Sequence, residues 1–211
     1  KKNKRKKISG KPKKVIEEII ENFNFQLPKS VPPLSSIISG YFSYDIIRYI
    51  EKIPNKNTDD LNVPDARLIR PRTLIVHDNL KKKIFYIINC FKDEKITDYN
   101  KKYNEIFKQI EDLIFLSNFN PNIFGHSIKN KNLKNNFSKI KSNISKSKFL
   151  NNVLKAKKYI KLGDVFQVVL SQRFEKKLTK KPLDIYKKLR ITNPSPFMYF
   201  FNFSDFQIIG A

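Results

Sequence analysis

The spacing of hydrophobic residues divides the chain into helical and strand-like stretches. Apolar residues three and four positions apart, with charged residues between them, are typical of amphipathic helices. This spacing predicts helices over residues 15–23, 96–115, 149–162 and 182–189. Apolar runs rich in β-branched and aromatic residues are typical of strands. Such runs predict strands over residues 41–44, 73–77, 83–90, 165–174, 198–203 and 206–209.

Short polar stretches and prolines set the expected connections between these elements. Residues 78–81 are predicted to form a hairpin turn between two strands. Residues 45–50 predict a helical turn in which Asp45 and Arg48, three positions apart, interact. Prolines limit regular structure, so residues 28–33 predict an extended connector and residues 60–71 a loop.

Gln167 is the polar interruption of the most strand-like stretch, GDVFQVVLSQRF at residues 163–174. Strand side chains alternate between two faces, so Gln167 is predicted to lie among hydrophobic residues in a buried strand. A buried amide without hydrogen-bond partners costs about 1–3 kcal/mol. Gln167 is therefore interpreted either as a satisfied core glutamine or as a residue of a functional site.

The net charge of +24 suggests a polyanionic partner. The distribution of the charge argues against that interpretation, because lysine supplies nearly all of it and occurs along the whole chain. Nucleic-acid sites favour clustered arginine instead. A basic nucleic-acid-binding module is kept as an alternative, and it rests mainly on the run of basic residues at 1–7.

The sequence contains few other chemical signals. The single cysteine, Cys90, excludes an intramolecular disulfide and is typical of a reduced, cytoplasmic setting. No apolar stretch approaches the length of a membrane span, so no membrane partner is expected. His77 has no serine, cysteine or acidic pattern around it, and no Cys/His metal spacing or phosphate-binding glycine loop occurs.

Composition divides the chain into four parts. Residues 1–13 carry charge without periodicity and are expected to form a disordered basic tail. Residues 14–116 form a first folded part, and residues 117–147, rich in Asn, Ser and Lys, form a linker. Residues 148–211 begin a second folded part. Because the last residues directly follow an apolar strand-like run, we expect the chain to be an internal fragment of a longer protein.

Four motifs in order carry a resemblance to a known family. They are GYFSYDIIRYIEKIP at residues 40–54, DLNVPDARLIRPRTLIVHDNLKKKIFYI at 60–87, GDVFQVVLSQRF at 163–174, and PLDIYKKLRITNPSPFMYFF with FQIIGA at 182–211. Together they resemble the large, chorismate-using subunit of anthranilate synthase, component I of the tryptophan pathway. The resemblance covers most of residues 28–211.

The resemblance implies an α+β fold of two antiparallel sheets packed against each other with helices outside, here incomplete. It places residues 14–116 in the N-terminal part of that fold and residues 148–211 at the start of the chorismate-binding region. The implied reaction is that of a lyase which converts chorismate and ammonia to anthranilate and pyruvate. A partner glutamine amidotransferase subunit supplies the ammonia, and Mg²⁺ holds the ring carboxylate through ligands expected beyond the C-terminus of this chain. A fragment without those ligands is expected to be inactive alone.

The resemblance also assigns roles to particular residues. Gln167 is implied to lie near the chemistry, where a neutral amide that orients ammonia is sufficient. The NPSPFM motif is implied to line the site of tryptophan, the feedback inhibitor; its residues are Asn193, Pro194, Ser195, Pro196, Phe197 and Met198. The family usually has tyrosine where this chain has Phe197, so any contact of that hydroxyl is missing here. The nearest enzyme alternative is the related aminodeoxychorismate synthase component of folate synthesis.

Overall fold

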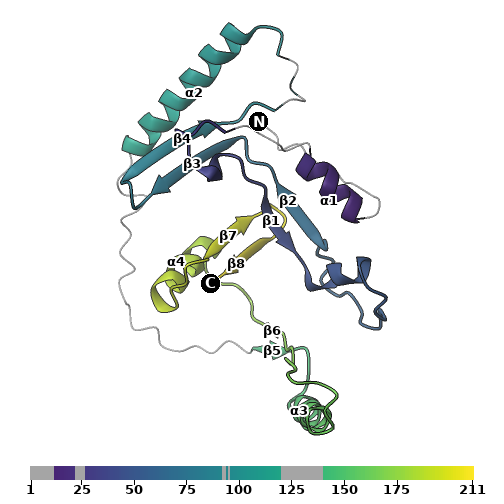
Figure 1. Ribbon diagram of the computed structural model, residues 1–211. Helices are drawn as coiled ribbons and strands as arrows, with labels where there is room; N and C mark the ends of the chain where they lie inside the picture. The colour runs from purple at the N-terminus through teal and green to yellow at the C-terminus, as the bar shows by residue number, and fades with distance from the viewer. Residues whose placement is uncertain (1–11, 22–26, 92–93, 95, 120–139) are drawn as a thin grey trace. The chain divides into compact units, whose positions relative to one another are not determined.

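The computed structural model describes residues 12–21, 27–91, 94, 96–119 and 140–211. The chain divides into two compact units, Lys1–His126 and Ser127–Ala211 (Figure 1). Most of the predicted linker, residues 120–139, and most of the predicted tail, residues 1–11, lie outside the described residues. Within those residues the strands pair into two-stranded antiparallel ribbons, and helices accompany them. The coarse prediction of an α+β fold is confirmed.

The first unit contains two of these ribbons. Its elements are α1 (Pro12–Glu21), η1 (Pro33–Ser35), β1 (Ser39–Phe42), η2 (Tyr44–Tyr49), β2 (Ala66–Ile69), β3 (Thr73–Asp78), β4 (Lys83–Ile88) and α2 (Tyr99–Phe119). β1 pairs with β2, and β3 pairs with β4. The predicted hairpin and the predicted strand that leads into a helical turn are both confirmed.

Two proline-based predictions are wrong. The predicted loop 60–71 contains the strand β2, because Pro64 and Pro71 lie on either side of β2 and leave its backbone free to pair with β1. The predicted extended connector runs into the 3₁₀ turn η1, which begins at Pro33. A proline suits the first position of a helix, since it needs no N–H there.

β1 and β2 approach each other closely at Gly40. Gly40 lies opposite Leu68, and a Cβ atom added at Gly40 would overlap the carbonyl group of Arg67. A glycine is therefore required at this position of the ribbon.

The carboxylate of Asp65 fastens the turn η2 to the start of β2. It accepts hydrogen bonds from the Ser43 hydroxyl at 3.0 Å and from the Tyr49 hydroxyl at 2.8 Å. The backbone N–H of Ser43 also donates to the Asp65 carbonyl at 2.6 Å. The predicted pair of Arg48 and Asp45 is confirmed at 2.7 Å, and Arg48 donates further to the Pro54 carbonyl. Polar contacts thus hold the motif of residues 40–54 in place.

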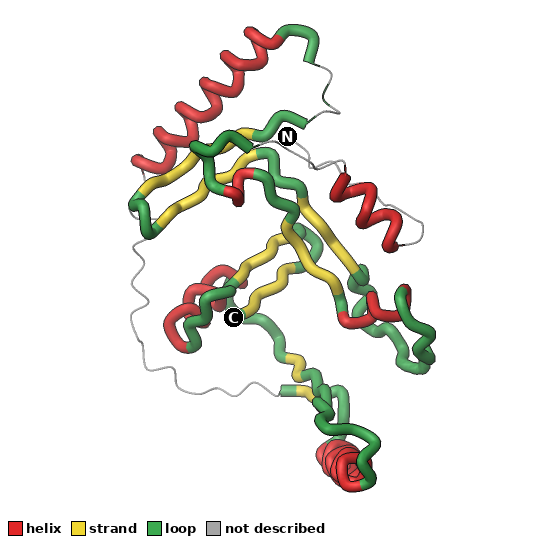
Figure 2. Tube along the Cα trace, viewed as in Figure 1, coloured by secondary structure: helices red, strands yellow, loops and turns green. Residues whose placement is uncertain are grey.

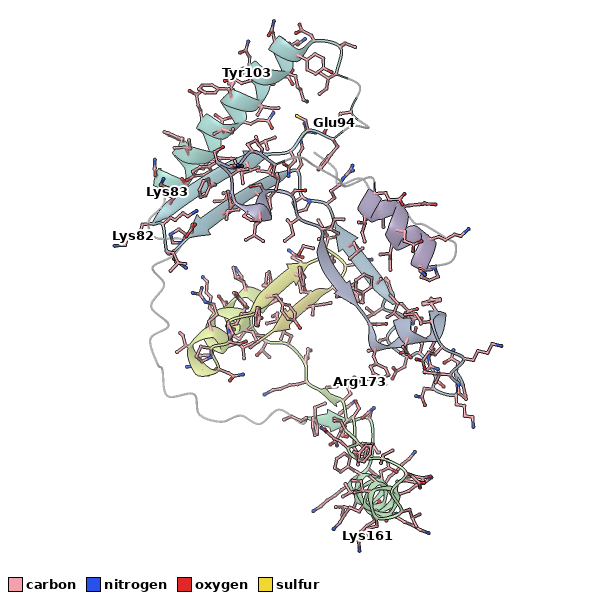
Figure 3. All side chains as sticks on the ribbon, in the orientation of Figure 1. Lys82, Lys83, Glu94, Tyr103, Lys161 and Arg173 are labelled. Atoms are coloured by element: carbon pink, nitrogen blue, oxygen red, sulfur yellow. The ribbon has the colours of Figure 1, made fainter. Side chains whose placement is uncertain are left out.

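The β3–β4 hairpin is closed by Asp78, whose carboxylate accepts from the N–H groups of Leu80 and Lys81. Lys82, beside Lys83 in Figure 3, completes the turn with a positive φ of 52°. His77 lies in β3 rather than in the turn and is exposed, and Cys90 is a half-buried free thiol.

α2 packs along β4. The Tyr86 hydroxyl lies 2.6 Å from the Ser117 hydroxyl, and near the start of the helix Glu94 pairs with both Arg72 and Lys102 (Figure 3). The helix begins at Tyr99, three residues later than predicted. Tyr99 and Tyr103, in the first two turns of α2, are 75% and 67% exposed. Their aromatic rings therefore lie outside the contact with β4.

The second unit contains the other two ribbons. Its elements are β5 (Lys141–Ser142), α3 (Lys146–Lys161), β6 (Phe174–Glu175), α4 (Pro182–Thr192), β7 (Tyr199–Asn202) and β8 (Gln207–Gly210). β5 pairs with β6, and β7 pairs with β8, so the predicted final hairpin is confirmed. Phe203 beyond β7 is only 6% exposed, because the rings of Phe201 and Phe206 contact it. None of the helices in the described ranges has the length and hydropathy that a bilayer crossing requires.

We expect the Asp65 carboxylate to raise the pH at which the Tyr49 phenol ionises. Its hydrogen bond and negative charge raise the pKa of the Tyr49 phenol above 10.0. The hydrogen bond therefore contributes to stability below pH 10 and is lost as the pH rises through the raised pKa.

An absorbance titration of tyrosinate tests this expectation in the protein that carries this chain. Subtracting the titration curve of Tyr49→Phe from that of the parent isolates the ionisation of Tyr49. In an Asp65→Asn background the midpoint of this difference curve should lie at lower pH. The negative charge beside Tyr49 is then gone, and the amide oxygen still accepts a hydrogen bond. Equal midpoints in both backgrounds would show that Asp65 does not act on Tyr49.

Candidate functional site

α3 ends where the Gln167 segment, residues 163–174, begins. Gly163 adopts a positive φ of 79°, its N–H donates to the Ile160 carbonyl at 3.1 Å, and the Asp164 N–H donates to the Tyr159 carbonyl at 3.1 Å. This pair of bonds is the glycine cap that commonly ends a helix. A left-handed residue is required there, which explains the glycine at the head of the motif.

The prediction of a buried strand over residues 165–174 is wrong. Residues 165–173 have no regular secondary structure, and Figure 2 shows them as a loop between α3 and the short strand β6. Gln167 is exposed, Phe166 is fully exposed and Val169 is 81% exposed. A strand requires hydrogen-bond partners on a neighbouring strand, and within the described residues this stretch pairs only at its end, through β6.

Both ends of the segment are nevertheless fixed. Gly163 caps α3 at one end, and at the other the side-chain nitrogen of Gln172 donates to the Ser142 hydroxyl at 2.8 Å. The Arg173 N–H donates to the side-chain oxygen of Asn143 at 3.0 Å. Gln167 lies midway between these two attachments.

Ser142 and Asn143 were missed by the sequence analysis. Both lie in the stretch 117–147, whose abundance of Asn, Ser and Lys is typical of a linker. No local pattern in the sequence signals that they contact residues 30 positions further along the chain.

The NPSPFM motif forms a turn between α4 and β7, as expected from its two prolines. The Asn193 N–H caps α4 by donating to the Leu189 carbonyl at 2.8 Å. The Ser195 hydroxyl accepts from the Phe197 N–H at 3.3 Å, which closes a small turn inside the motif. Ser195 and Met198 are half-buried, whereas Asn193, Pro194, Pro196 and Phe197 are exposed. The turn presents most of its residues to solvent.

The described residues offer no metal site, and a hollow after β6 is bordered by none of the predicted site residues. Within the described residues, no group of three or more His, Cys, Asp and Glu side chains is arranged to hold a metal ion. A hollow of about 210 Å³ lies after β6, bordered by Lys176, Lys177, Leu178, Thr179, Lys180 and Ile185. None of the predicted site residues borders it, so we do not assign it to the site.

Comparison with known proteins decides the family. Residues 2–211 match the chorismate binding enzyme family. The chain belongs to this family. The resemblance inferred from the four motifs is thereby confirmed, and the family membership favours the chorismate-based interpretation over a nucleic-acid-binding module.

Individual members of the chorismate binding enzyme family are similar along nearly the whole chain. Anthranilate synthase component 1 of Acetivibrio thermocellus is 36% identical over 204 residues, which are 97% of this chain and 41% of that protein. The protein of the same name from Aquifex aeolicus (strain VF5) is 32% identical over 95% of this chain and 39% of its own length. This chain spans about two fifths of the length of these relatives.

A solved structure supports the same placement. The crystal structure of anthranilate synthase component I from Streptococcus pneumoniae TIGR4 is 30% identical and superimposes with a TM-score of 0.75. The superposition covers 93% of this chain and 42% of that chain.

Proposed function

We propose that the protein to which this chain belongs is component I of anthranilate synthase. In the proposed reaction, chorismate and ammonia give anthranilate, pyruvate and water. Ammonia adds to the ring, the ring hydroxyl leaves, and the enolpyruvyl group is then eliminated as pyruvate. The observation that carries the proposal is the similarity along 97% of the chain to relatives that bear this name.

The chain would supply only part of the active site, because it spans about two fifths of these relatives. The proposal includes a fold of two packed antiparallel sheets with outer helices, to which residues 14–116 and 148–211 contribute. It also includes Mg²⁺, whose carboxylate ligands we expect in the part of the relatives that this chain does not cover.

Gln167 is proposed to orient the attacking ammonia. Ammonia is already a competent nucleophile at its nitrogen, so it requires a hydrogen-bonding partner rather than a base. An exposed amide on a segment fixed at both ends meets this requirement, because it is accessible and its position is restricted.

The proposed partners follow from the same function. A glutamine amidotransferase subunit would supply the ammonia, and the protein would act in the cytoplasm. Tryptophan would bind as feedback inhibitor at the turn of residues 193–198.

The product formed from chorismate tests the main proposal. The protein that carries this chain, incubated with chorismate, Mg²⁺ and an ammonium salt, should form anthranilate, which is detected by its fluorescence. Formation of aminodeoxychorismate instead would assign the protein to folate synthesis. Omitting chorismate provides the blank.

Replacement of Gln167 tests its role in the same assay. Gln167→Ala should lower turnover by about 10²-fold, the cost of a poorly placed reactant. Ser171→Ala is the matched control, since Ser171 is an exposed polar residue of the same segment. Unchanged turnover in Gln167→Ala, in a protein that stays folded by circular dichroism, would remove Gln167 from the chemistry.

Replacement of Ser195 tests the tryptophan site. Ser195→Ala removes the hydroxyl that accepts from the Phe197 N–H. Loss of one such bond, worth about 1 kcal/mol, should raise the tryptophan concentration for half-inhibition about fivefold. Ser171→Ala again serves as the control. An identical inhibition curve for Ser195→Ala would show that tryptophan does not depend on this turn.

A further inference from the structure

The two stretches 142–143 and 172–173 form a neck that closes a loop of the chain. The side-chain nitrogen of Gln172 donates to the Ser142 hydroxyl at 2.8 Å. Next to it, Asn143 pairs with Arg173 twice, because its side-chain oxygen accepts from the Arg173 N–H at 3.0 Å and its own N–H donates to the Arg173 carbonyl at 3.1 Å. Figure 3 labels Arg173 at this neck.

Asn143 extends the β5–β6 ribbon beyond its last backbone pair. The ribbon pairs Lys141 with Glu175 and Ser142 with Phe174. At the next position the Asn143 side chain provides the acceptor that a backbone carbonyl would otherwise supply. Both backbone groups of Arg173 are therefore held by a single residue.

The loop that the neck closes consists of α3 and most of the Gln167 segment. α3 starts just after the neck, with Ser145 as its N-cap accepting from the Lys148 N–H. A helix of 16 residues is about 24 Å long. Gly163 then reverses the chain direction, and residues 164–172 return to the neck.

Residues 164–172, which return to the neck, must span most of the distance that a chain of this length can reach. They must cover about the length of the helix, since the neck lies beside the first residues of α3 and Gly163 follows its last turn. Nine residues reach at most about 30 Å when fully extended. Opening the neck would leave the chain tied at Phe174 of β6 but would add residues 172 and 173 to the free segment. Gln167 would then have more room to move than it has with the neck closed.

We propose that Ser142 and Asn143 are positioning residues that hold Gln167 in place by closing this neck. This inference rests on the proposed role of Gln167 in orienting ammonia. It assigns a function to two residues of a stretch whose composition is that of a linker.

The test uses the complete protein that carries this chain. Asn143→Ala removes the acceptor for the Arg173 N–H, and Asn143→Asp keeps an oxygen at that place. We expect kcat/KM for ammonium to fall about tenfold in Asn143→Ala and to recover in Asn143→Asp. Ser142→Ala and Ser142→Thr form a second pair with the same logic, because threonine keeps the hydroxyl that accepts from Gln172. Asn151→Ala, at an exposed position of α3, is the matched control.

A double-mutant cycle separates positioning from a general structural role. If Asn143 acts through Gln167, then Asn143→Ala should change kcat/KM less than about twofold in a Gln167→Ala background. An equal fall in both backgrounds would overturn the proposal, as would an unchanged kcat/KM in the single variant Asn143→Ala.

A second measurement does not depend on activity. The neck holds Arg173 in paired backbone, so tryptic cleavage after Arg173 should be faster in Asn143→Ala than in the parent or in Asn143→Asp. If the parent makes no anthranilate, or if Gln167→Ala keeps full turnover, the proposed function fails on its own. The rate of tryptic cleavage after Arg173 would then still show whether Asn143 closes the neck. An unchanged rate in Asn143→Ala would show that it does not.

Discussion

An aspartate or asparagine side chain makes hydrogen bonds at one end of each of the four ribbons that the described residues form. Asp65 precedes β2 and accepts from Ser43 and Tyr49, and Asp78 closes the β3–β4 turn. Asn143 extends the β5–β6 pair, and Asn202 at the end of β7 accepts from the Ser204 N–H and the Gln207 side chain. The side chains of Asp78, Asn143 and Asn202 accept from backbone N–H groups, and the Asp65 carboxylate accepts from side-chain hydroxyls. Such contacts restrict the ends of the ribbons.

The ribbons depend on polar side chains because little of the described structure is buried. Among the described residues only Phe203 and Ser35 are buried, at 6% and 1% exposure. A two-stranded ribbon without a covered apolar face is marginally stable at best. In this chain taken alone, which spans about two fifths of its relatives, hydrogen bonds at the ends of the ribbons therefore carry a larger share of the local order than they would beneath a packed core.

Elements formed by contacts between near neighbours in the sequence could be predicted, and those formed by distant contacts could not. The helical spacing located α3 and α4, and the residues around the turns located the β3–β4 and β7–β8 hairpins. β2 was missed because its partner β1 ends 24 positions before it begins (42 to 66) and the prolines beside it suggested a loop. For residues 165–173 the error was the reverse, because a strand was predicted where none forms. Strand propensity does not show whether a partner strand is present.

The candidate site shows the same limit on a smaller scale. The residues 167 and 193–198 could be selected only through resemblance to a family, because a glutamine or a proline-rich turn specifies no chemistry alone. Gln167 was predicted to be buried in a strand, and the structure shows an exposed residue instead. Exposure and a restricted position are compatible, since a short segment held at Gly163 and at Asn143 has few conformations available. The contacts that hold this segment join residues 30 positions apart, which is why no local pattern of the sequence could indicate them.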